Sequence, residues 1–153
     1  MISRRSQTRS IRGVAAVEFG LLLVPLVLIT FGITEYGRAI YTYNTLDKAA
    51  RDAVRHLSAG GPGDATRQAE ASCLVRYGNT GCTGTTLAPG LTSANVSICD
   101  AVACAGTHDN QPTTAGTIDL MTVTIQNYAY DSVMEFVMPD LNFNNISVTM
   151  RSQ

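Results

Sequence analysis

The stretch GVAAVEFGLLLVPLVLITFGIT, residues 13–34, sets the organisation of the whole chain. Glu18 is the only charged residue between Arg12 and Glu35. At about 1.5 Å of rise per helical residue, residues 14–34 span ~31 Å, close to the thickness of the hydrocarbon core of a bilayer. The sequence therefore predicts a transmembrane helix over residues 14–34. A carboxylate inside such a segment costs roughly 2.5–3.5 kcal/mol on insertion scales, which makes Glu18 a candidate functional residue.

The charges on either side of this segment predict its orientation. Residues 1–13 form a basic leader without an acidic residue, and its arginines are Arg4, Arg5, Arg9 and Arg12. By the positive-inside rule the leader stays in the cytoplasm, so residues 59–153 belong to an exported part of a single-pass protein. That part is acidic, with three arginines against eight Asp and Glu after Leu57. Because it offers little charge to neutralise phosphates, we expect no nucleic-acid partner.

A cleavable secretory signal is the main alternative for the apolar segment. Such a signal has an apolar region of about 7–15 residues, followed by a small-residue cleavage site of the A-x-A type. Here the apolar run is longer, and the residues that follow it, ITEYGR at 33–38, contain no such site. Ala15 and Ala16 precede the apolar core instead of following it. We therefore expect the segment to remain as an anchor.

The helix is expected to continue beyond the membrane as an amphipathic helix over residues 35–58. Apolar residues recur there at helical spacing, at Tyr36, Ile40, Tyr43, Leu46, Ala50, Val54 and Leu57. The sequence GGPG at 60–63 ends the helix. The tyrosines near its start suit the membrane–water interface, and they are Tyr36, Tyr41 and Tyr43.

Two further features of this long helix carry expectations about its shape and surroundings. Pro25 removes a backbone donor, so it predicts a kink or local unwinding near Leu21 and Leu22. Glu35 and Arg38, three residues apart, are interpreted as a solvated ion pair or a contact with lipid headgroups. On this interpretation the pair is not a docking site.

The exported part predicts a small α+β domain. Asp64 is a candidate N-cap for a short helix from Ala65 to Tyr77. Apolar–polar alternation predicts strands near 95–99, 117–127 and 145–151, with the middle one central in an antiparallel sheet. Loops are expected over 78–93 and 101–116, and residues 130–138 are either a short helix or a loop. We expect the outer half of the long helix to pack on the sheet through Ala50, Val54 and Leu57.

All four cysteines lie in the exported part, at Cys73, Cys82, Cys99 and Cys104. An even number of cysteines in an oxidising compartment predicts two disulfides, and three pairings are possible. We favour the local pairs Cys73–Cys82 and Cys99–Cys104. The spacing C-x4-C-x3-H that ends at His108 is an alternative signal for zinc. Because no fourth ligand stands at a useful spacing, we favour the disulfide and expect no metal site.

Four blocks of the first third of the chain, taken in order, resemble the TadE-like family of minor pseudopilins of tight-adherence (Flp-type) pili. The blocks are GVAAVEF at 13–19, Pro25, GI-EYGR within 32–38, and AARDAVR at 49–55. The family commonly has a glycine at or beside the position of Ala53, which is a mild departure here. The resemblance implies a bacterial inner-membrane protein with a pilin-like fold, in which the long helix packs on a small antiparallel sheet.

The resemblance also implies roles for individual residues. A prepilin peptidase would cut between Gly13 and Val14, and glycine lets the backbone extend and approach the enzyme. Glu18, next to Phe19, would then compensate the new Val14 amine of a neighbouring subunit and act in assembly. The alternative for Glu18 is a carboxylate that snorkels to the interface without a partner.

These observations favour a structural and assembly function over an enzymatic one. The expected partners are the inner membrane, a prepilin peptidase and other pilins or pseudopilins of the pilus machine. The C-terminal domain would lie in the periplasm or enter the extracellular pilus. No nucleophile elbow, phosphate loop or metal cluster is present in the sequence, so we expect neither enzymatic activity nor a cofactor. An uncleaved, membrane-anchored binding or adhesive module is the alternative.

Overall fold

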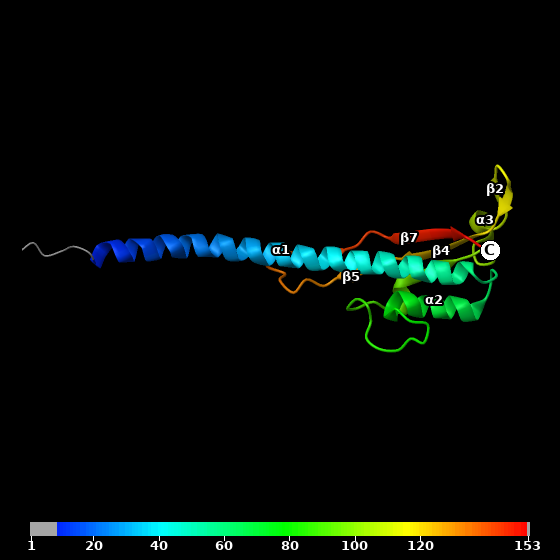
Figure 1. Ribbon diagram of the computed structural model, residues 1–153, viewed down its shortest axis with the longest axis horizontal. Helices are drawn as coiled ribbons and strands as arrows, with labels where there is room; N and C mark the ends of the chain where they lie inside the picture. Colours follow the sequence, from blue (N-terminus) through cyan, green and yellow to red (C-terminus); the bar gives the residue numbers. More distant parts are fainter. Residues whose placement is uncertain (1–8, 153) are drawn as a thin grey trace, which may run out of the picture.

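The computed structural model describes residues 9–152, with side chains from Gly13 onward. Its dominant element is α1, a single helix from Arg9 to Ser58 that extends far beyond the folded domain (Figure 1). This helix begins five residues before the expected start at Val14. The positively charged side chains of the leader lie outside the described residues.

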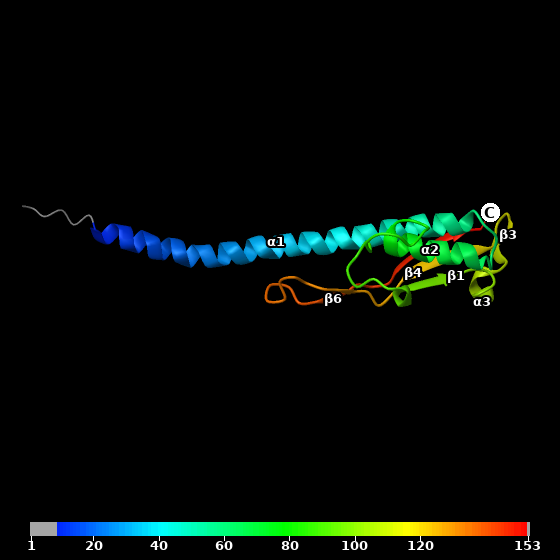
Figure 2. The ribbon, with the colours of Figure 1, turned by 90° about the horizontal axis from the view of Figure 1, so that it is seen from below.

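Helix α1 continues without interruption through Pro25, and the local unwinding expected near Leu21 and Leu22 is wrong. The helix instead curves gently along its length (Figure 2), which is a common way for a long helix to relieve the clash of a proline ring. Two hydroxyls in this half bond back to the helix: Thr30 Oγ1 donates to the Leu26 carbonyl at 2.8 Å, and Thr34 Oγ1 to the Thr30 carbonyl at 2.9 Å. Each polar group therefore has a partner without leaving the helix.

The folded domain is built on a three-stranded antiparallel sheet in the order β1-β4-β7. Its strands are β1 (Val96–Cys99), β4 (Leu120–Ile125) and β7 (Ile146–Arg151). The central strand places Val123 opposite Ile98 on one side and Val148 on the other. Both edge strands agree with the sequence expectation, and the α+β class is confirmed.

The expected central strand, 117–127, is divided in the structure. Its first part is β3 (Gly116–Ile118), which pairs with β2 (Gln111–Thr113) in a separate hairpin. Asp119 lies between β3 and β4, and its Oδ1 accepts a hydrogen bond from the Asn110 N–H at 2.9 Å. The side chain of Asp119 thus fastens the hairpin where the main sheet begins, which the strand pattern alone did not indicate.

The remaining elements are short. Helix α2 (Ala65–Tyr77) has the expected bounds, and Asp64 caps it by accepting from the N–H groups of Thr66 and Arg67. The others are the 3-10 turn η1 (Ser93–Asn95), helix α3 (Ala105–His108) and the paired strands β5 (Ala129–Tyr130) and β6 (Leu141–Asn142). Residues 131–140 form an irregular loop between β5 and β6.

The core lies between the outer half of α1, helix α2 and one face of the sheet. The predicted contact residues Ala50, Val54 and Leu57 are all buried there. They share the core with Leu46 of α1, Val75 of α2 and the β4 side chains Met121, Val123 and Ile125. The long helix therefore packs on a small antiparallel sheet through the face that the sequence indicated.

The start of the apolar stripe is wrong. Tyr36 is 61% exposed and Ile40 is also exposed, whereas Glu35 and Ala39 are buried. At about 100° per residue, Ala39 and Glu35 lie within about 20° of Leu46 around the helix axis, but Ile40 lies about 120° away. The first residues of the predicted apolar stripe, Tyr36 and Ile40, therefore do not lie on the face of α1 that contacts the domain.

Candidate functional site

The predicted cleavage point, Gly13–Val14, lies within α1 and away from the folded domain. A Cβ added to Gly13 would meet no atom within 4 Å, and Val14 is exposed. The backbone here is helical, so a protease that binds an extended substrate would have to unwind this turn. Glycine lowers the cost of that unwinding, because it stabilises a helix less than any residue except proline.

Glu18 and Phe19 are both exposed on the part of α1 that projects from the domain. Glu18 lies four residues after Val14, so the two side chains share one face of the helix. Among the described residues, Glu18 has no hydrogen bond or ion pair. The structure thus places the predicted cleavage and assembly residues close together on one exposed helical segment.

The segment around them is apolar and uncovered. Its large side chains stand exposed from Val14 to Ile33, and the helix is long and apolar enough to cross a membrane. In a water-soluble protein such a surface would be an aggregation hazard. Its length and composition suit a membrane anchor, with Glu18 as the single charge that the anchor carries.

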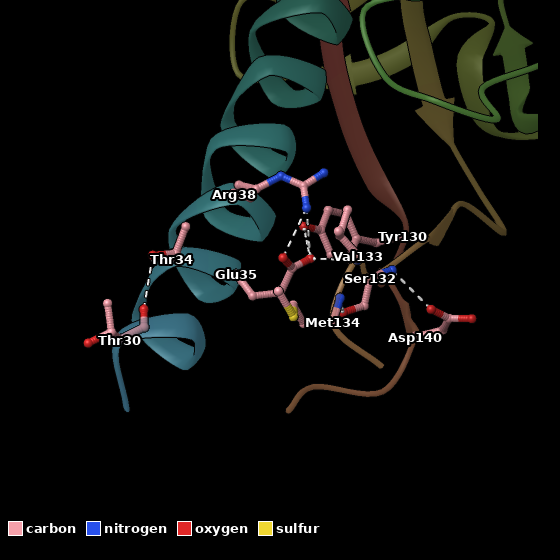
Figure 3. Close-up of polar contacts among 9 residues, drawn as sticks. All are labelled: Thr30, Thr34, Glu35, Arg38, Tyr130, Ser132, Val133, Met134 and Asp140. Carbon is pink, nitrogen blue, oxygen red and sulfur yellow. Dashed lines mark hydrogen bonds and ion pairs between the residues drawn. The ribbon is translucent and has the colours of Figure 1, made fainter. Parts of the chain in front are cut away.

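A second cluster lies where this segment ends, and Figure 3 shows it around Glu35. The Glu35 side chain is only 3% exposed. Its carboxylate accepts hydrogen bonds from the Tyr130 hydroxyl at 2.8 Å and from the Val133 N–H at 3.2 Å. Arg38 Nη1 donates to both carboxylate oxygens, at 3.0 and 2.9 Å.

The interpretation of Glu35 and Arg38 as a solvated or headgroup pair is therefore wrong for Glu35. The ion pair with Arg38 exists, but the carboxylate is enclosed by the loop that follows β5. Burial acts to raise the pKa of Glu35, yet the hydrogen bonds from Tyr130, Val133 and Arg38 outweigh it, so the pKa lies below the usual value. The ionised carboxylate thus links α1 to the domain at the end of the core nearest the apolar segment.

An aromatic cluster supports this link. The Phe143 ring lies 5.7 Å from the Tyr130 ring, 5.5 Å from the Tyr128 ring and 5.6 Å from the Tyr43 ring of α1, between centroids. Tyr43, expected at the membrane interface, remains exposed and makes an edge contact with Phe143, the residue that follows β6. Packing of this kind fixes the position from which Tyr130 reaches Glu35.

Asp100 is a second buried carboxylate that the sequence did not reveal. Its Oδ2 accepts from the Gly63 N–H and from Gln68 Nε2, both at 2.8 Å. Its Oδ1 accepts from the N–H groups of Val102 at 3.0 Å and Ala103 at 2.7 Å. Burial acts to raise the pKa of Asp100, but these hydrogen bonds hold it below the usual value. Asp100 joins the turn after α1 to the turn after β1.

The cysteines form the two local disulfides, Cys73–Cys82 and Cys99–Cys104. The first ties α2 to the loop after it, and the second closes the turn between β1 and α3. His108, the third member of the zinc alternative, has hydroxyl partners on both ring nitrogens, Thr122 and Thr107, each at 2.8 Å. The only other group of potential metal ligands among the described residues consists of the exposed carboxylates Asp131, Glu135 and Asp140. Exposed acidic groups of this kind are common without a metal ion.

The sequence contained one usable signal for the Glu35 cluster. Glu35 lies on the same helical face as Ala39 and Leu46, which a strict count of 3.6 residues per turn would have placed toward the domain. Nothing local pointed to Tyr130 or to the backbone of Val133 as its partners. Asp100 directly follows β1, and nothing at this position in the sequence indicated that its carboxylate would accept four hydrogen bonds.

Comparison with known proteins finds a family similarity in the N-terminal part. A family model described as TadE-like protein matches residues 13–55, which confirms the resemblance over this range. The match includes the exposed apolar half of α1, Glu18, Glu35 and most of the buried face of the helix. It does not include the disulfides or the sheet. No curated protein and no solved structure matches the chain.

Proposed function

We propose, from the TadE-like character of residues 13–55, that this protein is a minor pseudopilin of a tight-adherence (Flp-type) pilus. The observation that carries the proposal is the long helix α1, whose first half is apolar and exposed while its second half is built into a folded domain. A subunit that moves from a membrane into a filament needs such a helix, since one surface must suit both lipid and neighbouring helices.

The proposed arrangement is a single-pass protein of the bacterial inner membrane. The arginines of the leader would remain in the cytoplasm, and the domain with its two disulfides would fold in the periplasm. From there the subunit would be carried into the pilus or stay as an assembly primer. The proposed role is structural, and it assigns no catalytic step to the chain.

Processing by a prepilin peptidase would remove the basic leader and create a new amine at Val14. This amine would be a cation beside lipid, and Glu18 is the only carboxylate in the apolar segment. In a medium of low dielectric constant the attraction between them is far stronger than in water. We propose that Glu18 compensates the Val14 amine of a neighbouring subunit, with Phe19 packing in the same contact.

The experiment replaces Glu18 with Gln, which keeps the shape of the side chain and removes its charge. The variant should still accumulate in the membrane, because a neutral side chain costs less to insert. Crosslinking to other pilus subunits and the number of surface pili should both fall. Thr30→Ala is the matched control, since it also removes a polar group from the membrane half of α1, and it should assemble like the wild type. Normal assembly by Glu18→Gln would contradict the proposed role.

The second candidate function is an uncleaved, anchored binding or adhesive module. One observation favours it: the loop over 78–92 is rich in Gly and Thr, mostly exposed, and held in place by the Cys73–Cys82 disulfide. Loops of this kind often carry binding residues on a rigid scaffold. Retention of the leader in the mature protein distinguishes this candidate from the pseudopilin.

A further inference from the structure

The loop between β5 and β6, residues 131–140, runs back along α1 toward its N-terminal half (Figures 1 and 2, orange). We call it the β5–β6 loop. A Cβ placed on Gly32 would lie 3.5 Å from Val137 Cγ1, so the loop reaches into the apolar segment 14–34. Two of its side chains are strongly exposed, Val133 at 69% and Phe136 at 82%. The folded domain therefore places Val137 beside the end of the apolar segment, in a loop that also exposes Val133 and Phe136.

The β5–β6 loop is held in a defined shape. At its neck, the Ser132 N–H donates to Asp140 Oδ1 at 3.0 Å (Figure 3). At its tip, the N–H groups of Val137 and Met138 donate to the Met134 carbonyl at 2.8 and 2.9 Å. The Val133 N–H is bound by Glu35. Because these backbone donors have partners inside the protein, the loop can leave bulk water at a reduced cost.

We infer that the β5–β6 loop rests in the outer leaflet of the membrane that α1 spans, with Val133, Phe136 and Val137 in contact with lipid. The inference rests on the proposed anchoring of residues 14–34. Val137 lies beside Gly32, three residues before Glu35, which corresponds to about 4.5 Å along the helix. Side chains such as Phe136 extend beyond the backbone, so the loop matches the ~5–10 Å depth typical of interfacial segments.

The acidic residues of the β5–β6 loop define the kind of lipid surface that it fits. Asp131, Glu135 and Asp140 are exposed, and residues 131–140 contain no Lys or Arg. Carboxylates remain at the headgroup level, which keeps the insertion shallow. They also repel anionic headgroups, so the loop contacts lipid through its apolar side chains and not through charge. A zwitterionic surface suits this composition better than an anionic one.

A contact at this place would give the domain two attachments to the membrane. Helix α1 supplies the first, and the β5–β6 loop supplies the second on the side of the helix that the Glu35 cluster fixes. Two attachments restrict the tilt of the domain relative to the bilayer, whereas a single helix would leave it free to swing. The Glu35 cluster then sets the depth and direction of the loop.

The chain contains no tryptophan, so one introduced tryptophan reports on a single place. Three full-length variants are reconstituted in phosphatidylcholine vesicles: Phe136→Trp in the loop, Leu22→Trp in the membrane segment and Val102→Trp as the matched control. Val102 is 68% exposed and lies beside Gly63, past the distal end of α1. Emission is recorded with and without lipids brominated near the glycerol end of the acyl chains.

The inference predicts that Phe136→Trp is blue-shifted and quenched by the brominated lipids, as Leu22→Trp is, whereas Val102→Trp is neither. A higher share of anionic lipid should reduce the quenching of Phe136→Trp without changing that of Leu22→Trp.

If Phe136→Trp matches Val102→Trp while Leu22→Trp is quenched, the proposed contact of the loop with lipid is wrong, but the proposed membrane anchor is retained. If Leu22→Trp is not quenched, the anchor itself is wrong. A blue shift of Phe136→Trp that depends on protein concentration and not on brominated lipid would identify a second copy as the occupant and overturn the lipid contact.

Discussion

The Tyr130 hydroxyl donates a 2.8 Å hydrogen bond to the Glu35 carboxylate across 95 residues of sequence. Glu35 is the first residue after the apolar segment, and Tyr130 is the last residue of β5, directly before the loop that returns to Glu35. This contact fixes the folded domain to α1 at the point where the apolar segment ends. The orientation of the domain relative to the anchor therefore depends on a buried, ionised side chain.

Tyr130→Phe removes this hydroxyl and leaves the ring in place. We expect a lower stability of the domain, because the buried carboxylate loses a donor that it cannot replace with water. Tyr128→Phe is the matched control: the Tyr128 hydroxyl donates to the neutral Pro89 carbonyl at 3.0 Å, so its loss should cost about 1 kcal/mol. Pulse proteolysis of the full chain across a urea gradient measures both. The role given to Glu35 is wrong if Tyr130→Phe destabilises the protein less than Tyr128→Phe.

Val54→Asp tests the packing of α1 on the sheet. Val54 is fully buried among apolar side chains, so an aspartate there should reduce the free energy of unfolding by on the order of 3–5 kcal/mol. Ile40→Asp is the control on the same helix, since Ile40 is exposed in the structure although the apolar pattern placed it in the same stripe. It should leave the stability of the domain nearly unchanged. An equal loss of stability in the two variants would mean that Ile40 is buried as the apolar pattern predicted, and it would contradict the face of α1 observed here.

The buried carboxylates predict a loss of stability in acid. The pKa of Asp100 and that of Glu35 are both lowered in the folded protein. Each group therefore contributes stability above the ordinary carboxyl pKa of about 4, and this contribution is lost as the pH falls through the lowered value. Near-UV circular dichroism in urea at a series of pH values below 5 should show the midpoint falling.

Asp100→Asn isolates the Asp100 part of this effect. The variant should be less stable at neutral pH, because an amide nitrogen cannot accept from the donors that surround Asp100. Its urea midpoint should also fall less between pH 5 and the acid limit than that of the wild type. An unchanged acid dependence would mean that the Asp100 carboxylate contributes nothing through its ionisation.

Local signals in the sequence were sufficient for much of the fold. Asp64 and Gly78 mark the two ends of α2, and alternation marks β1 and β7, because caps and strand periodicity act over a few residues. The division of the middle strand at Asp119 was missed, since it depends on a hydrogen bond to Asn110 in a hairpin. Periodicity cannot show a side chain that competes with the backbone ladder.

From the sequence, only the N-terminal part of the candidate site was singled out. Glu18 stood out because a charged side chain in a long apolar segment has a high free-energy cost of membrane insertion. The partners of Glu35 could not, since Tyr130 and Val133 approach it only after the sheet has formed and β5 has been placed. The partners of Asp100 were missed for the same reason, because Gly63 before α2 and Gln68 within α2 are brought to it only by the tertiary fold.

The measurement that tests the proposed pseudopilin most directly is the intact mass of the protein coexpressed with a prepilin peptidase. The wild type should yield a product that begins at Val14. Gly13→Leu should remain uncut, because a bulky side chain obstructs the approach of the scissile bond to the enzyme. Gly20→Leu is the matched control, since Gly20 also has no atom within 4 Å of an added Cβ, and it should be cut like the wild type. A wild-type protein that keeps its leader, or a Gly13→Leu variant that is cut as readily as Gly20→Leu, would contradict the proposal.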